Sequence, residues 1–348
     1  MSFSANPVAG PSVWTRGDLA RETDWIRPLD AADLEDIDRA MAATAGMHLL
    51  ELDAHRFALP RFGGKLAAIA EELENGRGIV QIRSLPVARY SREDCKRMIW
   101  GIGTHLGTGL SQSKRGDYLG EVTDLGVEMD RSDARAYRSK GVSRFHTDRC
   151  DVVGLLCVVK ARKGGESRVV SAPAVHNEVL RRRPDLLEAL YGDFHHSRQG
   201  EEAPGEARSF ASPVFAFRDG KFASQMSFLY TESAQRFPEV PRMSEAQKEA
   251  MALIAQVADE LYVESPFEPG DLQLLNNHLA WHCRAGYEDE DATEKRRLLY
   301  RLWLATPNSR ALPQKFLDSW GSIEPGALRG GVISAGGWRV PRLSKEFT

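Results

Sequence analysis

Apolar side chains recur at helical spacing in several stretches of the chain. Between residues 62 and 75, Leu66, Ile69, Ala70 and Leu73 fall on one helical face, which predicts an amphipathic helix. Comparable patterns predict further helices at about 30–45, 91–106, 173–182, 184–190 and 244–261. Asp30 and Ser91 stand where the N-caps of the first two are expected.

Shorter apolar or alternating segments between these helices predict strands. They lie at about 78–83, 118–123, 143–148, 152–161 and 167–171, and a β-rich stretch follows from 194 to 229. Later in the chain, a Pro-Gly-Asp turn at 269–271 leads into an apolar, strand-like run, and residues 296–304 form the last predicted strand. Period-two spacing places Arg297, Leu299, Arg301 and Trp303 on one face of that strand. Two arginines on a mostly apolar strand need anionic partners if they are buried.

Composition and charge narrow the class of protein. A chain of 348 residues with 42% hydrophobic content can bury a large core, and its net charge of −3 argues against nucleic-acid binding. No apolar run approaches the roughly 18 residues of a membrane span, and the N-terminus shows no signal pattern, so we expect a cytoplasmic protein. The four cysteines lack the spacing of a metal site or a disulfide framework, which predicts reduced thiols: Cys95, Cys150, Cys157 and Cys283.

The segment His146-Thr147-Asp148 offers a candidate metal site. Residues two apart on an extended segment point the same way, so the imidazole and the carboxylate share a face. With one distant histidine they would form a 2-His-1-carboxylate facial triad, which leaves the other positions on iron(II) open. We take His282 as the third ligand, with His278 as its competitor. Without a third ligand, the tripeptide is more often an ordinary loop sequence.

These residues resemble the iron(II)/2-oxoglutarate-dependent dioxygenases of the taurine dioxygenase-like (TauD/TfdA) family. The match comprises the His146-x-Asp148 motif, the distal His282, and Arg297 fifteen residues after it. It also includes Gly164-Gly165-Glu166-Ser167, similar to the family's Gly-Gly-x-Thr turn, with serine in place of threonine. Choosing His278 would lengthen the gap to the arginine and break the match. The resemblance covers roughly residues 14–313.

The resemblance implies a fold, cofactors and a reaction. The expected fold is α+β, with a distorted double-stranded β-helix (jelly-roll) core and flanking helices. Because the chain shows no repeats or separating linker, we expect one catalytic domain over residues 1–348, with residues 1–13 and 314–348 as peripheral ends. The expected cofactors are Fe(II), the co-substrate 2-oxoglutarate and O2. The expected reaction hydroxylates or desaturates a small organic molecule and converts 2-oxoglutarate to succinate and CO2.

The resemblance also assigns roles around the metal. Arg297, assisted by the Ser167 hydroxyl, would bind the far carboxylate of 2-oxoglutarate, because a guanidinium offers a planar fork. The alternative for Arg297 is a structural ion pair with the acidic residues 288–294. Arg301 faces the same way and would contact the co-substrate region or an anionic substrate group, or else pair with a neighbouring carboxylate. Asn277 would orient a ligand or satisfy backbone at a strand end.

The substrate side is less defined by the sequence. Ser111 and Gln112 are candidate substrate contacts, and residues 228–241 are a candidate lid. Basic and aromatic residues that flank the metal motif could recognise a carboxylate or could be a solvated loop: Tyr137, Arg138, Arg144 and Arg149. Four other histidines are interpreted as surface or helix-associated residues: His105, His176, His195 and His196. We expect a small-molecule substrate that can carry an anionic group, and a chain that can form a homo-oligomer.

Two other functions could use a related scaffold: a halogenase and a non-enzymatic metal-binding protein. A halogenase on the same scaffold would need a small residue in place of the carboxylate ligand, and Asp148 argues against it. A non-enzymatic jelly-roll metal-binding protein would have no reason to keep both Arg297 and Ser167. The combination of the four motifs therefore favours the oxygenase.

Overall fold

Helices and strands alternate along the computed structural model, which describes residues 6–124 and 142–340. The helices are α1 (Arg16–Arg21), α2 (Ala31–Ala43), α3 (Phe62–Asn75), α4 (Arg92–Thr104), α5 (Ala172–Arg182), α6 (Pro184–Leu190), α7 (Phe228–Ala234), α8 (Glu245–Leu261) and α9 (Leu317–Trp320). The strands are β1 (Ile26–Pro28), β2 (Ile79–Arg83), β3 (Thr108–Gly109), β4 (Gly120–Val122), β5 (Val152–Val159), β6 (Lys163–Gly164), β7 (Ser167–Ser171), β8 (Phe194–Ser197), β9 (Ser209–Ser212), β10 (Phe215–Arg218), β11 (Lys221–Ser224), β12 (Val263–Ser265), β13 (Leu272–Asn276), β14 (Ala280–Arg284), β15 (Tyr287–Glu288) and β16 (Leu298–Ala305).

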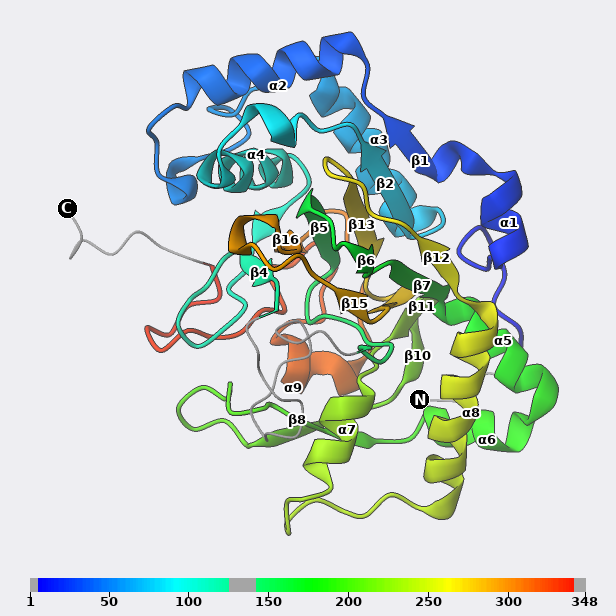
Figure 1. The fold of residues 1–348 in the computed structure, drawn as a ribbon. Helices are drawn as coiled ribbons and strands as arrows, with labels where there is room; N and C mark the ends of the chain where they lie inside the picture. Colours follow the sequence, from blue (N-terminus) through cyan, green and yellow to red (C-terminus); the bar gives the residue numbers. More distant parts are fainter. Residues whose placement is uncertain (1–5, 125–141, 341–348) are drawn as a thin grey trace.

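Two sheets form the centre of this α+β fold (Figure 1). The large sheet has the order β1-β2-β13-β5-β16-β3, with β4 also paired to β16. It is mixed, because β1 and β2 run parallel while β13, β5 and β16 pair antiparallel. The small sheet is antiparallel and has the order β12-β7-β14.

Residues of β16 alternate between two apolar clusters. Leu298, Tyr300, Leu302 and Leu304 belong to the cluster that α2, α3 and α4 share with the large sheet. Leu299 and Trp303 belong to the cluster between the large and small sheets. The two faces of this strand are therefore the two faces predicted from the sequence, and the arginine-bearing face is turned toward the small sheet.

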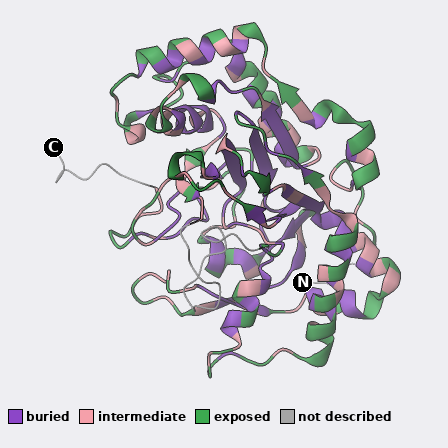
Figure 2. Cartoon of the chain, viewed as in Figure 1, coloured by how far each residue is buried: buried purple, intermediate pink, exposed green. Residues whose placement is uncertain are grey.

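Helices cover both outer surfaces of the paired sheets. The helices α2, α3 and α4 lie over the outer face of the large sheet, and α5, α6 and α8 pack against the small sheet (Figure 1). The central strands are buried while the outward sides of the helices are exposed (Figure 2). Asp30 and Ser91 cap α2 and α4 as predicted: Asp30 accepts from the Ala32 and Asp33 amides and Ser91 from the Asp94 amide.

The prediction of a continuous strand at 143–148 is wrong. The segment forms two isolated antiparallel bridges, both at His146: one to Ser227 and one to His282. It lies between two other segments and pairs with each at a single residue, so no ladder develops. The β-rich prediction for 194–229 holds for β8 to β11, but its end becomes α7, which begins at Phe228.

Residues 314–340 are more than a peripheral end. Trp320 and Arg329 are fully buried, and the Arg329 guanidinium forms an ion pair with Asp151 at 2.8 Å. A buried arginine needs a paired carboxylate, and Asp151 lies three residues beyond the metal motif. In the described ranges no helix has the length and apolar character needed to cross a membrane.

Candidate functional site

A cavity of about 350 Å³ lies between the two sheets and contains the residues predicted to bind metal. The large sheet contributes Leu155 from β5 together with Leu299, Arg301 and Trp303 from β16. The small sheet contributes Ser167 from β7 and the end of β14, from His282 to Arg284. The loop 142–149, the start of α7 and the end of β8 with the residues after it also line the cavity.

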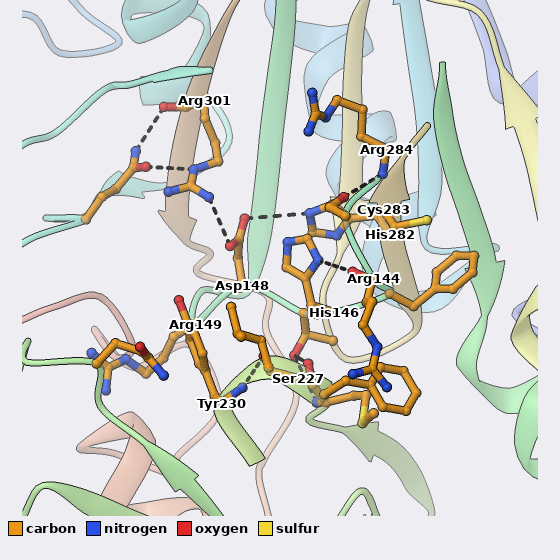
Figure 3. A pocket seen from close by; sticks show the side chains of 18 of the residues that line it. Arg144, His146, Asp148, Arg149, Ser227, Tyr230, His282, Cys283, Arg284 and Arg301 are labelled. Atoms are coloured by element: carbon orange, nitrogen blue, oxygen red, sulfur yellow. Dashed lines mark hydrogen bonds and ion pairs between the residues drawn. The ribbon is translucent and has the colours of Figure 1, made fainter. Parts of the chain in front are cut away.

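Backbone pairing brings the three candidate ligands together. The amides and carbonyls of His146 and His282 exchange two hydrogen bonds of 3.0 Å, which sets their rings 4.4 Å apart. Asp148 Oδ2 lies 3.8 Å from His282 Nε2, and one ligand atom from each of the three residues falls within 4.8 Å of the others (Figure 3). Among the described residues, the structure therefore assembles a compact set of two imidazoles and one carboxylate.

The protonation states of this set suit a divalent metal. His146 Nδ1 lies 2.9 Å from the Arg144 carbonyl, which can only accept, so Nδ1 is the donor in this contact and Nε2 is the ring nitrogen left for a metal. Burial and the neighbouring His146 lower the pKa of His282 to about 3, so this imidazole is neutral. Burial alone would raise the pKa of Asp148, but the charge of Arg301 holds it below its usual value. Asp148 Oδ2 is buried and accepts no hydrogen bond in the described chain.

Asn277 fixes the backbone that carries Asp148. Its side-chain oxygen accepts from the Asp148 amide at 3.0 Å, and its nitrogen donates to the Cys150 carbonyl at 3.0 Å. This contact combines the two roles considered for Asn277, since it satisfies backbone and thereby orients the ligand segment. The competing histidine, His278, instead pairs with Asp151 through Nε2 at 3.0 Å and is fully buried away from the cavity.

Arg297 and Ser167 lie at one end of the cavity. The Arg297 side chain is buried and forms no ion pair in the described chain, and its Nη1 has no hydrogen-bond partner. Burial and the charge of Arg284 lower the pKa of Arg297 to about 10. Asp289, in the acidic loop, binds only the Arg297 backbone amide, at 2.8 Å, which argues against the structural ion pair. The Ser167 hydroxyl donates to Gln273 Oε1 at 2.7 Å.

Gly165 explains part of the Gly-Gly-x-Ser motif. Its φ of +80° lies in the left-handed region, and a Cβ at this position would lie 3.0 Å from Arg297 Nε. The glycine therefore lets the chain turn while the Arg297 side chain passes close to it. Its carbonyl accepts from Arg297 Nη2 at 3.4 Å.

Arg284 is a pocket residue that the sequence reasoning missed. It is buried at the end of β14, and its guanidinium carbon lies 4.5 Å from the centre of the Tyr287 ring. The guanidinium carbon of Arg297 lies 5.1 Å from the same ring, so Tyr287 contacts both cations. The spacing could have revealed Arg284, because a residue two positions after His282 on a strand shares its face.

Arg301 is held by protein groups rather than left open for a substrate. Its Nη1 lies 3.2 Å from Asp148 Oδ1, and its Nε donates to Gln112 Oε1 at 2.9 Å. Gln112 in turn donates to the Arg301 carbonyl at 2.9 Å. Of the alternatives considered, the pairing with a neighbouring carboxylate is therefore the one observed. The Ser111 hydroxyl donates to the Ser113 carbonyl, and Ser111 is not among the residues that line the cavity.

The other residues considered for substrate recognition are those that flank the candidate metal motif and the candidate lid. Arg144 forms an ion pair with Glu232 at 2.6 Å, so it is not a free solvated charge. Arg149 is half-buried and lines the cavity. Tyr137 and Arg138 lie outside the described residues. The first part of the candidate lid is α7, whose Ser227 N-cap and Phe228 to Tyr230 also line the cavity.

The interpretation of His196 as an ordinary surface or helix-associated residue is wrong, whereas His176 lies within α5 and is helix-associated as expected. Both are almost completely buried, and His196 lines the cavity. His196 Nδ1 lies 3.2 Å from the Thr231 hydroxyl, which itself donates to the Ser227 carbonyl. Burial and the neighbouring His195 lower the pKa of His196 to about 3.

We expect protonation of His196 in the unfolded chain to destabilise the fold in acid. The folded chain keeps His196 neutral down to about pH 3, whereas an unfolded histidine takes up a proton below about pH 6.5. The contribution of His196 to the free energy of unfolding is therefore fully present above about pH 6.5. It falls by 1.36 kcal/mol per pH unit below that, which is a loss of about 2 kcal/mol between pH 6.5 and pH 5. Urea unfolding at pH 7 and pH 5 should show a smaller pH difference for His196→Gln than for the wild type. His195→Gln is the matched control, and equal pH dependence in all three chains would contradict the assignment.

The sequence of the chain matches one family model and two characterised relatives over most of its length. The model of the family described as "Taurine catabolism dioxygenase TauD, TfdA family" matches residues 44–303. The chain is 30% identical over 326 residues to FR-33289 synthase of Streptomyces rubellomurinus, covering 90% of this chain and 95% of that protein. It is 27% identical over 303 residues to the taurine hydroxylase-like protein SAT17 of Stachybotrys chartarum, covering 83% of this chain and 77% of that protein.

Solved structures share the fold at low sequence identity. Asparagine oxygenase, solved in complex with Fe(II), 2S,3S-3-hydroxyasparagine and succinate, has a TM-score of 0.64 at 14% identity. That likeness covers 80% of this chain and 93% of the oxygenase. The non-heme iron oxygenase OrfP, solved with Fe, succinate and (3S)-hydroxy-L-Arg, has a TM-score of 0.61 at 14% identity and covers 80% and 94% of the two chains.

Proposed function

The chain belongs to the TauD/TfdA family of dioxygenases, and we propose that His146, Asp148 and His282 hold the iron(II) on which its reaction depends. It is a non-haem iron(II)- and 2-oxoglutarate-dependent oxygenase acting on a small molecule. The observation that carries the residue assignment is the convergence of these three side chains at the wall of one cavity.

The donor set fits iron(II). Two neutral imidazoles and one carboxylate form a facial triad, which leaves three positions for the co-substrate and dioxygen. The buried Asp148 Oδ2 lacks a hydrogen-bond partner in the described chain. A carboxylate oxygen that binds a cation needs no such partner. When bound, iron(II) and 2-oxoglutarate supply the oxidation of a C–H bond by dioxygen, with conversion of 2-oxoglutarate to succinate and CO2.

Arg297 is our proposed anchor for the far carboxylate of 2-oxoglutarate. Its Nη1 is buried without a partner in the described chain, a costly arrangement that a bound carboxylate would relieve. The neighbouring charge of Arg284 makes this end of the cavity strongly attractive to an anion. The Ser167 hydroxyl lines the same cavity and would add a neutral hydrogen bond, in exchange for its contact with Gln273.

The arrangement of the sheets supports the finer fold proposal. Two facing sheets that enclose the ligands between them fit a distorted double-stranded β-helix, with the helices packed outside. The ion pair between Arg329 and Asp151 joins the end of the described chain to the metal segment, which supports one catalytic domain.

The decisive test is turnover of the co-substrate by the purified chain. Loaded with iron(II) and supplied with 2-oxoglutarate and oxygen, it should release succinate and CO2 slowly alone and faster with a true substrate. Amino acids, carboxylates, sulfonates and phosphonates form the first panel, and mass spectrometry of products would show oxygen insertion or loss of two hydrogens. Absence of succinate in every condition, with metal still bound, would favour the non-enzymatic metal-binding alternative.

Arg301→Gln should reduce coupled and substrate-free turnover equally. Because Arg301 contacts Asp148 and Gln112, its loss disturbs the carboxylate ligand that both reactions need. By analogy with groups that orient metal ligands, we expect about a 10- to 100-fold decrease in succinate formation in both assays. A rise in the KM of the substrate alone would instead return Arg301 to substrate recognition. Gln112→Leu, which removes only the supporting contact, should give a smaller loss.

A further inference from the structure

Asp151 follows Asp148 by three residues but does not line the cavity. Its carboxylate is almost completely buried and is contacted by three other segments of the chain. Oδ1 accepts from His278 Nε2 at 3.0 Å and from Arg329 Nε and Nη2 at 2.9 and 2.8 Å. Oδ2 accepts from the amide of Thr306, which directly follows β16, at 3.2 Å. One carboxylate therefore joins the metal segment to three segments that are distant in the sequence.

Asp148 is the candidate ligand that the backbone pairing between the two ligand segments leaves out. His146 and His282 are fixed to each other, because their backbones exchange two hydrogen bonds. The Asp148 amide instead bonds to the side chain of Asn277, which lies in the turn 276–279 before β14. The position of the Asp148 carboxylate relative to the two imidazoles therefore depends on how this turn is held.

Asp151 holds that turn against the metal segment. Its carbonyl accepts from the Asn277 amide at 3.0 Å, and its carboxylate accepts from the next residue, His278. The His278 side chain is fully buried, and burial lowers its pKa to about 4, so the ring is neutral and donates through Nε2. Two consecutive residues of the turn are thus bound to Asp151, and one of them also reaches Asp148.

Arg329 balances the buried charge of Asp151. A carboxylate in the interior needs a paired cation, and the Arg329 guanidinium supplies it through two hydrogen bonds to Oδ1. Burial alone would raise the pKa of Asp151, but the hydrogen bond from His278 and the charge of Arg329 hold it below its usual value. The Trp320 ring packs against both partners, 4.7 Å from the His278 ring and 5.7 Å from the Arg329 guanidinium carbon. Buried partners therefore fix the carboxylate in one place.

We propose that Asp151 is a positioning residue for the metal site: it holds the turn 276–279 in place and thereby sets where the Asp148 carboxylate meets the metal. The inference rests on the proposed function, since it needs a metal bound by Asp148. It gives His278 a part in the site as a support for this turn rather than as a ligand. Groups outside a metal site usually act in this way, by orienting the residues that bind the ion.

The test compares two variants that remove both buried charges together, so that neither leaves an unpaired charge. Asp151→Leu/Arg329→Met abolishes the His278 contact, whereas Asp151→Asn/Arg329→Met keeps an oxygen that can accept from His278. Co(II), whose visible absorption reports the arrangement of its ligands, is titrated into each metal-free chain. The first variant should bind Co(II) about 10-fold or more weakly than the wild type and alter its spectrum, and the second should stay within about 3-fold.

A double-mutant cycle shows whether the effect passes through Asp148. In an Asp148→Ala background, Asp151→Leu/Arg329→Met should weaken Co(II) binding by less than about 3-fold, because the ligand that Asp151 positions is gone. Losses of the same size in both backgrounds, or an unchanged Co(II) affinity in the first variant, would overturn the role of Asp151. Failure of the wild type to bind Co(II), or equal binding after Asp148→Ala alone, would overturn the proposed ligand set itself.

Thermal unfolding of the metal-free chains separates positioning from damage to the fold. Asp36→Asn is the matched control, because Asp36 is a buried carboxylate of α2 that accepts from the Arg61 and Phe62 amides. It should lower the unfolding temperature and leave Co(II) affinity unchanged, and a comparable loss of affinity here would assign the effect of Asp151 to stability. If the apolar pair does not fold, His278→Phe takes its place in both comparisons, because it removes the contact and keeps the ion pair of Asp151.

Discussion

Asp148→Ala should reduce succinate formation by at least about 100-fold. Loss of a residue that only hydrogen-bonds to a metal ligand usually costs about 10- to 100-fold, and loss of a ligand itself should cost more. The substitution removes the anionic ligand and leaves two neutral imidazoles, which bind a divalent cation much more weakly. Iron content after dialysis and succinate yield measure the effect. Full turnover by this variant would contradict the assignment of Asp148 as a ligand.

A second substitution separates metal loss from damage to the fold. Removing the Asp148 carboxylate also leaves the buried Arg301 guanidinium without its anionic partner, which can destabilise the protein by about 3–5 kcal/mol. Asp148→Asn keeps the size and one hydrogen-bond acceptor for Arg301 but lacks the charge. It should lose iron and turnover like Asp148→Ala while unfolding nearer to the wild-type temperature. Asp193→Ala, which removes a half-exposed carboxylate paired with Lys315, is the surface control.

Arg297→Ala should weaken 2-oxoglutarate binding by about 10- to 100-fold, while Ser167→Ala should weaken it by at most about 10-fold. Charge-assisted hydrogen bonds contribute about 1.5–3 kcal/mol and neutral ones about 0.5–1.5 kcal/mol, so the arginine has the larger effect. Burial increases the difference, because Arg297 Nη1 has no protein partner in the described chain whereas the Ser167 hydroxyl already bonds to Gln273.

Anaerobic titration of iron(II)-loaded variants with 2-oxoglutarate measures both effects. Arg297→Lys keeps the charge but loses the fork, so its affinity should fall between those of the wild type and Arg297→Ala. Arg296→Ala is the matched control, because Arg296 precedes it in the chain and does not line the cavity. An unchanged affinity in Arg297→Ala would transfer the role to Arg284, the other buried cation at this end.

Local sequence patterns predicted much of the fold, because the packing of one apolar face determines each of these elements. The predicted helix at 62–75 has the same limits in the structure as α3, since its apolar face packs on the large sheet. The predicted faces of the last strand are those of β16, since alternate residues pack into different clusters. The three candidate ligands are brought together as the sequence predicts.

The failures have a different physical origin. The segment 143–148 has the alternation of a strand, but pairing depends on neighbours, and Ser227 and His282 pair only with His146. Whether Arg301 meets a substrate or a protein carboxylate depends on the position of Asp148, which lies far away in the sequence. The burial of His196 likewise follows from how β8, Thr231 and Phe210 pack together, which no local pattern records.

The late segment that pairs with Asp151 has a consequence for the synthesis of the enzyme. The ribosome produces His146 and Asp148 well before Arg329, whose ion pair to Asp151 and neighbouring Gly331 amide bind the metal segment from behind. Val332, which lines the cavity, also donates its amide to the Ser111 carbonyl, close to Gln112. A nascent chain can therefore contain the three candidate ligands and Arg297 before residues 329–332 have been added. A chain stopped before residue 329 would lack this part of the cavity wall.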